Sequence, residues 1–151
     1  VLVKQGDANE AFEIKELEKP VLDSDDVLIK VEAFGLNFAD VMARQGLYKE
    51  APALPSVLGY DVVGVIEEVG NQSNEFFLGK RVVSMTRFGG YAEYAKTKAA
   101  GVSEISQKLP AGEALALATQ YSTAYYNFNE VCTLFTDRVT IMESCYMPSI
   151  H

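Results

Sequence analysis

Few residues of this 151-residue chain have the chemistry of a catalyst, and their types exclude several kinds of active site. The only histidine is His151, the last residue, and the only cysteines are Cys132 and Cys145. A Ser-His-Asp triad, a Cys-His dyad and a histidine metal cluster therefore each lack an essential member. Two cysteines are too few for a disulfide framework, and we expect free thiols of a reducing compartment rather than one bridge. Any chemistry must come from an external cofactor or from a site completed elsewhere.

Asn37 and Asp40 are spaced as at the beginning of a helix, which gives Asn37 two alternative roles. Asn is favoured as the residue that caps the free N–H groups of a first helical turn. An acidic residue in that turn is favoured by the positive end of the helix dipole. The spacing by itself therefore predicts a structural role, and a role of Asn37 in binding is the alternative.

The first 112 residues predict short strands separated by turns that contain glycine. A helix is expected from Asn37 to about Gln45, where Gly46 ends it. Gly64 is expected to break the strand in which it lies. Closely spaced strands of this kind predict a mainly β fold with some α, in the form of a small, partly open barrel. The expected strands are residues 1–4, 12–17, 27–34, 61–69, 81–85 and 91–95.

The last part of the chain, residues 113–151, has a different pattern. A helical stretch is expected from Pro110 to about Val131, with one packed face formed by Leu115, Ala118, Ser122 and Tyr125. Residues 138–142 predict one buried strand, but no second helix or strand follows to complete a βαβ unit. We therefore expect one domain over residues 1–112, followed by the beginning of a second, incomplete domain over 113–151.

Four segments resemble one enzyme superfamily in their order and spacing. They are GLNFADVMARQGLY at 35–48, LGYDVVGVIEEVG at 58–70, GKRV at 79–82 and GGYAEY at 89–94. The resemblance is to the N-terminal, GroES-like domain of the medium-chain dehydrogenase/reductase superfamily, and it covers about residues 1–142. Within that superfamily the sequence is similar to the zinc-independent quinone oxidoreductases. The resemblance implies a GroES-like barrel, then helices and one orphan strand of an incomplete Rossmann domain.

The assignment to the zinc-independent branch depends on two positions. In the zinc alcohol dehydrogenases a cysteine stands at the position of Asn37, and a histidine followed by glutamate stands at Tyr60 and Asp61. An amide and a phenol are poor ligands for Zn²⁺ at neutral pH. The four cysteines of the structural zinc lobe also have no counterpart, because no cysteine precedes Cys132. The sequence therefore predicts a protein without zinc.

The resemblance also implies which residues line the substrate cleft. Asn37, Tyr48 and Tyr60 are expected to line the nicotinamide and substrate cleft, where the Asn37 amide offers a donor and an acceptor. Thr123 matches a threonine that lies close to the nicotinamide in the family. Asp40 is expected to give structural support rather than to carry a proton. The alternatives are that the two tyrosines are half-buried packing residues and that Thr123 is an ordinary residue of a helix face.

The cofactor implied by the family is NADPH or NADH, but its phosphate-binding motif is absent from this chain. In the family, the strand that matches residues 139–142 leads into a glycine-rich turn that binds the pyrophosphate. The corresponding residues here, 143–148, read ESCYMP, and all eleven glycines lie at or before Gly112. We therefore expect the chain alone to lack the activity of the family.

The activity implied by the resemblance is hydride transfer from a nicotinamide to a small-molecule quinone or enone. The alternative is a non-enzymatic truncated paralogue, or an interaction module from a disrupted gene. Residues 144–151 have no counterpart in the family and motivate that alternative. Apolar surface left exposed on the C-terminal part would favour self-association.

The charge and hydropathy of the chain exclude other partners. A net charge of −8 disfavours binding to nucleic acid or to an anionic membrane surface. No apolar run approaches the ~20 residues needed to span a bilayer. The chain does not open on the pattern of a secretory signal, so a cytoplasmic location is expected.

Overall fold

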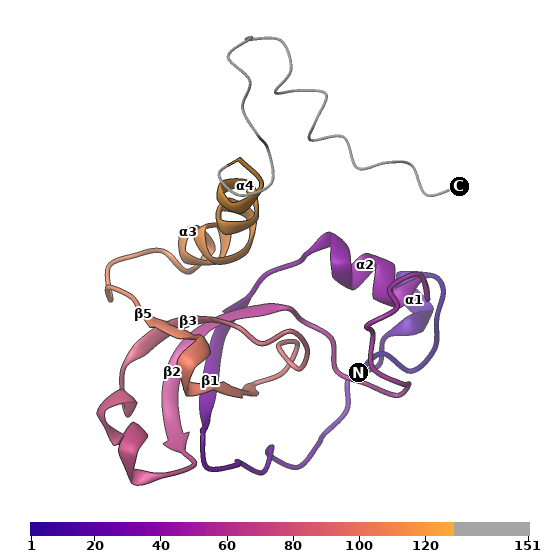
Figure 1. Cartoon of the computed structure of the whole chain (residues 1–151). Helices are drawn as coiled ribbons and strands as arrows, with labels where there is room; N and C mark the ends of the chain where they lie inside the picture. Colours follow the sequence, from indigo (N-terminus) through magenta and orange to yellow (C-terminus); the bar gives the residue numbers. More distant parts are fainter. Residues whose placement is uncertain (129–151) are drawn as a thin grey trace, which may run out of the picture.

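The computed structural model describes residues 1–128, apart from the side chain of Ser73, and its centre is an antiparallel sheet of five strands (Figure 1). The order across the sheet is β4-β1-β2-β3-β5. The strands are β1 (Asp26–Phe34), β2 (Asp61–Val69), β3 (Arg81–Met85), β4 (Tyr94–Lys98) and β5 (Val102–Glu104). The expected mainly β class with some α is confirmed, and the division of the chain at residue 112 stays a prediction.

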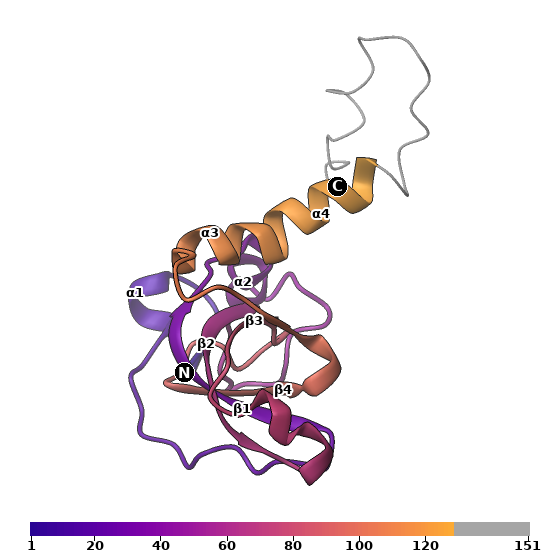
Figure 2. The same cartoon turned by 90° about the vertical axis from the view of Figure 1, so that its left-hand side faces the viewer.

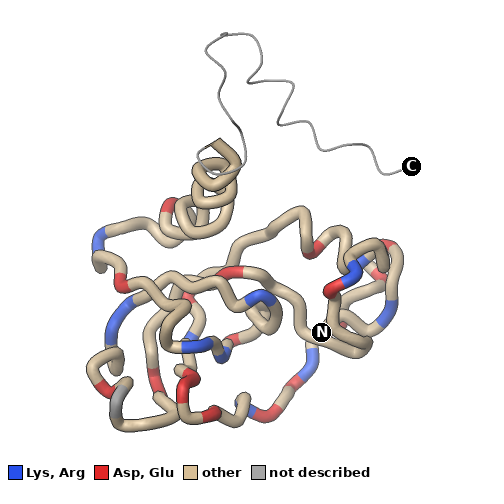
Figure 3. Tube along the Cα trace, viewed as in Figure 1, with Lys and Arg blue, Asp and Glu red and all other residues tan. Residues whose placement is uncertain are grey.

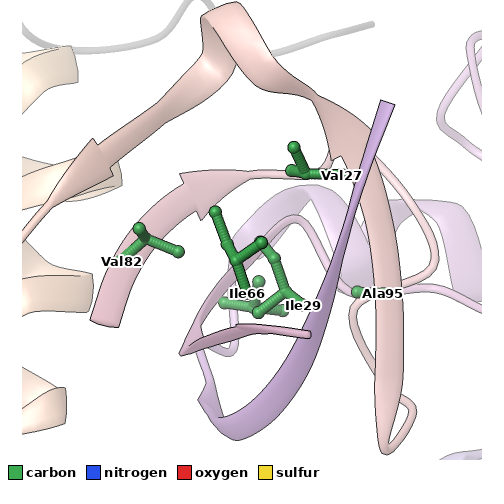
Figure 4. Packing of buried hydrophobic residues seen from close by; sticks show 6 residues of the cluster. Val27, Ile29, Ile66, Val82 and Ala95 are labelled. Carbon is green, nitrogen blue, oxygen red and sulfur yellow. The ribbon is translucent and has the colours of Figure 1, made fainter. Parts of the chain in front are cut away.

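The three central strands lie where the β-branched runs of the sequence predict them. Their apolar side chains meet on one face of the sheet, where Val27, Ile29, Ile66, Val82 and Ala95 are buried together (Figure 4). This face is the main core of the sheet. The strand expected at 91–95 lies three residues further along the chain, as β4, because the turn after β3 is longer than expected.

Gly64 does not break its strand, contrary to the prediction. It stays within β2 and pairs with Val31 at a point where the register of β1 shifts between Val31 and Ala33. A Cβ atom at Gly64 would lie 2.2 Å from the carbonyl oxygen of Lys30. The glycine is therefore needed for the close approach of the two strands at this bulge.

The two strands expected at 1–4 and 12–17 do not form. Leu2 makes only isolated bridges, with Phe12 and Ser56, and a short helix, α1 (Ala8–Ala11), lies between the two segments. Residues 13–23 contain no helix or strand, and Ile14 is fully exposed. Alternation of apolar and charged residues is not sufficient for a strand, because a strand also needs a partner for its backbone N–H and C=O groups.

Short helical turns complete the sheet-forming part of the chain. They are α2 (Phe38–Arg44) and the 3₁₀ helices η1 (Gln72–Phe77) and η2 (Ala99–Gly101). The helix α2 begins and ends within a residue of the expected boundaries, and Gly46 beyond it has a φ of +75°. A left-handed residue at this place is the usual end of a helix.

The helical stretch expected after Pro110 forms one continuous helix that leaves the sheet at an angle (Figure 2). It consists of α3 (Ala111–Leu115), the π-helix η3 (Ala116–Tyr121) and α4 (Ser122–Tyr126). Ala114 and Leu115 pack against Val63 of β2, whereas Ser122 and Tyr125 are exposed. The expectation of a packed face that includes Ser122 and Tyr125 is therefore wrong, because the helix projects beyond the sheet after its first turns.

Arg81 of β3 connects the sheet to the segment that leads into this helix. Its buried guanidinium pairs with Glu32 at 2.8 Å and donates hydrogen bonds to the carbonyl oxygens of Ser106 and Leu109, at 2.9 and 2.8 Å. These bonds fix the chain immediately before α3. Arg81 therefore helps to fix where the helix begins relative to the sheet.

Some predictions fall outside the described residues. They are the strand at 138–142, the end of the helix near Val131, and the residues Cys132, Cys145 and His151. Within residues 1–128, none of the helices has the length and apolar character to cross a membrane.

Candidate functional site

Asn37 begins α2 and lies beside the segment that leads into β2. The carboxylate of Asp40, in the first turn of the helix, accepts a hydrogen bond from the backbone N–H of Asn37 at 3.1 Å. The same carboxylate accepts one from the backbone N–H of Gly59, also at 3.1 Å. Asp40 is 6% exposed and links the beginning of α2 to the turn before β2. The role of Asp40 as structural support of the site stays a prediction.

Asp61, the first residue of β2, is the centre of a second set of hydrogen bonds. Its side chain is 1% exposed, and it accepts a hydrogen bond from the side-chain amide of Asn37 at 2.8 Å. It also accepts one from the hydroxyl of Thr119, on η3, at 2.5 Å. A Cβ atom at Gly35 would lie 2.3 Å from an Asp61 carboxylate oxygen. The glycine therefore provides the space in which the carboxylate orients Asn37.

Asn37, Asp40, Asp61 and Thr119 form a polar cluster. Tyr91 adds a phenol to this polar cluster from the turn before β4. Burial raises the pKa of its phenol strongly, and the negative charges of Asp40 and Asp61 and a hydrogen bond with Asp40 raise it further. The phenol therefore stays protonated and donates its hydrogen bond to Asp40. Its ring packs on Phe34, with the ring centroids 4.8 Å apart.

Three aromatic rings form the apolar part of the candidate site. The ring of Phe88 lies edge-on to Tyr48, at 6.5 Å between centroids, and edge-on to Tyr60, at 6.4 Å. The pKa of Tyr48 is raised, first by burial and then by Tyr60, which lies close enough for a hydrogen bond between the two phenols. We call Tyr48, Tyr60 and Phe88 the aromatic trio. Tyr60 directly precedes Asp61 in the chain, so the aromatic trio and the hydrogen bonds of Asp61 are connected through the backbone.

The structure brings together four of the five residues expected at the site. Asn37, Asp40 and Tyr60 are joined through Asp61 and Gly59, and Tyr48 joins them through the aromatic trio. Thr123 lies exposed on α4, one helical turn after the threonine that contacts Asp61. Its role at a cleft stays a prediction.

Sequence reasoning missed four residues of the site: Asp61, Thr119, Phe88 and Tyr91. The position of Asp61 holds a glutamate in the zinc enzymes, and that correspondence indicates no role for Asp61 in a protein without zinc. Thr119 lies four residues before Thr123, so the helical spacing contained a signal for it. Phe88 and Tyr91 lie in and beside the turn with Gly89 and Gly90, where composition gives no indication of a partner.

A groove of about 1050 Å³ lies on another part of the molecule. It is formed by residues 12–20, residues 31–34 of β1 and residues 91–94. Tyr91 is the one residue that it shares with the polar cluster, and it includes none of Asn37, Tyr48 and Tyr60. The candidate site is therefore not this groove.

The donor atoms at the site are unsuited to a transition metal. The positions of Asn37 and Tyr60 present an amide and a phenol, and Asp61 uses its carboxylate oxygens to accept hydrogen bonds. Within the part of the chain that the structure describes, no three His, Cys, Asp or Glu side chains are grouped so that they could hold a metal ion.

Comparison with known proteins places the fold in one family. Residues 23–107 match the family model of the alcohol dehydrogenase GroES-like domain. Quinone oxidoreductase of Homo sapiens is 42% identical over 107 residues, which are 70% of this chain and 32% of that protein. The synaptic vesicle membrane protein VAT-1 homolog of Danio rerio is 38% identical over 107 residues, 71% of this chain and 22% of that protein.

Solved structures of VAT-1-like proteins and quinone oxidoreductases share the fold of this chain. The human VAT-1 homolog-like protein superposes with a TM-score of 0.81 at 30% identity, over 88% of this chain and 43% of that one. Quinone oxidoreductase from Pseudomonas syringae gives 0.76 at 31% identity, over 87% and 40%. Quinone oxidoreductase from Thermus thermophilus, solved also with NADPH, gives 0.70 at 29% identity, over 84% and 38%.

These matches leave the larger part of each relative uncovered. The chain spans about a third of the length of human quinone oxidoreductase, and no more than 43% of the three solved structures. The match to the family model nevertheless extends over more than half of this chain and includes the sheet, α2 and the candidate site residues Asn37, Tyr48 and Tyr60. The chain belongs to the alcohol dehydrogenase GroES-like domain family of the medium-chain dehydrogenase/reductase superfamily.

Proposed function

We propose that this chain supplies the substrate side of an NAD(P)H-dependent, zinc-independent quinone or enone oxidoreductase. The observation that supports the proposal is the junction of a polar cluster, Asn37–Asp61–Thr119, with the aromatic trio. Relatives that match this part of the chain are quinone oxidoreductases. Quinones and enones are planar and carry a carbonyl oxygen, so they need both an aromatic wall and a hydrogen-bond donor.

Asn37 would donate the hydrogen bond to the substrate carbonyl, and the tyrosines would form the aromatic wall. The hydrogen bond to Asp61 uses one of the two N–H groups of the Asn37 amide and fixes the direction of the other. Tyr48 and Tyr60 would contact the flat face of the substrate and keep water away from it. Asp40 and Tyr91 would hold the beginning of α2, and with it Asn37, in place.

The residues present do not fit the whole of a dinucleotide cofactor. The relative from Thermus thermophilus binds NADPH. A pyrophosphate needs backbone N–H groups that it can approach closely, which glycine-rich turns provide. Residues 113–151 contain no glycine, and residues 1–128 as described contain no glycine-rich turn that opens a helix. We therefore propose that the nicotinamide end alone would meet this chain and that the phosphates would be bound by another domain.

A quinone titration followed by NMR of the tyrosine rings tests the proposal. With 1,4-naphthoquinone as the probe, the signals of Tyr48 and Tyr60 are expected to shift and saturate. Tyr94, which lies under the amino group of Lys19, serves as an internal control and should not shift. Asn37→Ala should weaken binding. Equal shifts at Tyr94 and at the aromatic trio would contradict the proposal.

A second candidate function is that of a non-enzymatic interaction module that self-associates. The observation in its favour is the exposed apolar surface of the helix, where Leu117, Tyr121 and Tyr126 are 50%, 61% and 60% exposed. Sedimentation should then show dimers or larger species, and Leu117→Lys should reduce their fraction. A monomer at high protein concentration would exclude this candidate. For either function we propose a cytoplasmic location.

A further inference from the structure

The turn between β3 and β4 is attached along its length to the segment that carries Tyr60. The backbone N–H groups of Thr86 and Arg87 both donate to the carbonyl oxygen of Tyr60, at 2.8 and 3.2 Å. Beyond the turn, the N–H of Tyr91 donates to the carbonyl oxygen of Leu58 at 2.8 Å. The place of Phe88 in this turn is therefore fixed relative to Tyr60.

Arg87 gives the turn a second attachment, to the loop that carries Tyr48. Its side chain forms an ion pair with Glu50, two residues after Tyr48. Its φ of +64° lies in the left-handed region, and no other non-glycine residue between 1 and 128 is recorded there. A side chain disfavours this conformation, so a glycine would be expected here unless the Arg87 side chain were needed.

The ring of Phe88 occupies the space between the two tyrosines. It meets Tyr48 at an interplanar angle of 62° and Tyr60 at 77°, which are the edge-to-face arrangements favoured by aromatic pairs. Tyr60 lies near enough to Tyr48 to raise the pKa of its phenol. Phe88 thus contacts both rings of a neighbouring pair of tyrosines.

We propose that Phe88 is a positioning residue that holds Tyr48 against Tyr60, and that the ion pair of Arg87 with Glu50 fastens the Tyr48 loop to the Phe88 turn. What the two tyrosines bind rests on the proposed function. The positioning itself is a property of the free chain, so it can be tested without any substrate.

The first test is the titration of Tyr48 in chains with ¹³C-labelled tyrosine, with its signal assigned by Tyr48→Phe. In the native chain the pKa of Tyr48 is expected above its ordinary value of about 10, because the phenol is partly removed from water and lies near Tyr60. In Phe88→Leu it should fall toward that value. The matched control is Phe76→Leu, an exposed phenylalanine that contacts Phe77 and Lys80 and should leave Tyr48 unchanged.

The second test uses Arg87→Gly, which keeps the left-handed backbone available and removes the ion pair. The charged or titratable groups that act on Tyr48 are Tyr60, Glu50 and Arg87. Loss of the Arg87 charge alone would raise the pKa of Tyr48, because the guanidinium stabilises the phenolate. Release of the loop would lower it, because the ring becomes more hydrated. We expect the pKa of Tyr48 to fall in Arg87→Gly, and a rise would contradict the role of the ion pair. An unchanged pKa of Tyr48 in Phe88→Leu would contradict the role of Phe88.

A titration with 1,4-naphthoquinone separates this proposal from the proposed function. If both hold, Phe88→Leu weakens quinone binding by about two- to tenfold, the range for loss of an aromatic pair, while Phe76→Leu does not. If the native chain binds no quinone but the pKa of Tyr48 falls in Phe88→Leu, the positioning role is supported and the proposed function fails. If quinone binds both chains equally and the pKa stays constant, the positioning role fails.

Discussion

Asn37 has the structural role that its spacing predicts, and its role in binding stays a prediction. Asn37 occupies the capping position directly before α2, and its side-chain amide donates to the buried carboxylate of Asp61. The capping position was predictable, because capping depends on residues three apart in the sequence. The partner Asp61 lies 24 residues away, and no local pattern indicates a contact over that separation.

The substitution Asn37→Ala should lower the free energy of unfolding by about 1–3 kcal/mol, since the helix loses its capping residue and Asp61 loses a donor. Asn37→Asp should cost at least as much, because a second carboxylate would face that of Asp61. Urea denaturation measures both changes. Asn9→Ala, at an exposed position of α1, is the control, and an equally small effect of all three variants would contradict this account of Asp61.

The packed face expected on the helix after Pro110 includes residues that lie beyond the π-helix η3. A sequence projection with 3.6 residues per turn assigns Ala118, Ser122 and Tyr125 to the face of Leu115. A π-helix has a wider turn, so the projection loses its register between residues 116 and 121. Thr119 contacts Asp61, whereas residues 121–126 are all exposed because the helix projects beyond the sheet. No composition rule indicates a π-helix in advance.

At the scale of elements, prediction succeeded where a strand has neighbours on both sides. The runs at 27–34, 61–69 and 81–85 are rich in β-branched residues and form β1, β2 and β3. The run at 12–17 alternates equally well but stays irregular, because its backbone does not pair with the sheet. Alternation reports that one face is apolar, whereas strand formation depends on a partner distant in the sequence.

The attachment of the helix to the sheet depends on Arg81. Arg81→Met should destabilise the chain by about 1–3 kcal/mol, because the carbonyl oxygens of Ser106 and Leu109 lose their donor. Amide exchange should also become faster in residues 106–115. The neighbouring Lys80→Met removes an exposed ion pair with Glu104 and a contact with the ring of Phe76, and should cost less than about 1 kcal/mol. Faster exchange in both variants would argue against a special role for Arg81.

The pairing of β1 with β4 makes the stability of the sheet sensitive to acid. Asp26 of β1 has its pKa lowered from 3.8 to about 2, mainly by a hydrogen bond from Lys98, and also by the N–H of Asp23 and by Lys96. A lowered pKa in the folded state means that the carboxylate stabilises the fold above pH 3.8 and that this contribution is lost as the pH falls toward 2.

The native chain and Asp26→Asn should therefore differ in stability at neutral pH and converge in acid. Urea denaturation at a series of pH values down to about 2 measures the difference. Asp25→Asn, at an exposed residue that also pairs with Lys98, is the matched control and should show a smaller dependence on pH. A constant difference between the native chain and Asp26→Asn over the whole range would contradict the lowered pKa.

At the scale of the whole molecule, charge and apolar surface are unevenly distributed. Among the residues that the structure describes, the charged ones lie mostly on the sheet, its loops and the first helices, and Glu113 is the only one within 111–128 (Figure 3).

The family and the fold class were both predictable, because four segments kept their order and spacing. The contact of η3 with Asp61 was not, because it joins the two parts of the chain on either side of residue 112.

The central claim is that the chain carries a substrate side without a site for the cofactor phosphates. Calorimetric titration of NADPH into the 151-residue chain, and into the same chain joined to the nucleotide-binding domain of a quinone oxidoreductase, tests it most directly. We predict no tight binding by the chain alone and clear binding by the joined protein. Tight binding of NADPH by the 151-residue chain alone would contradict the claim.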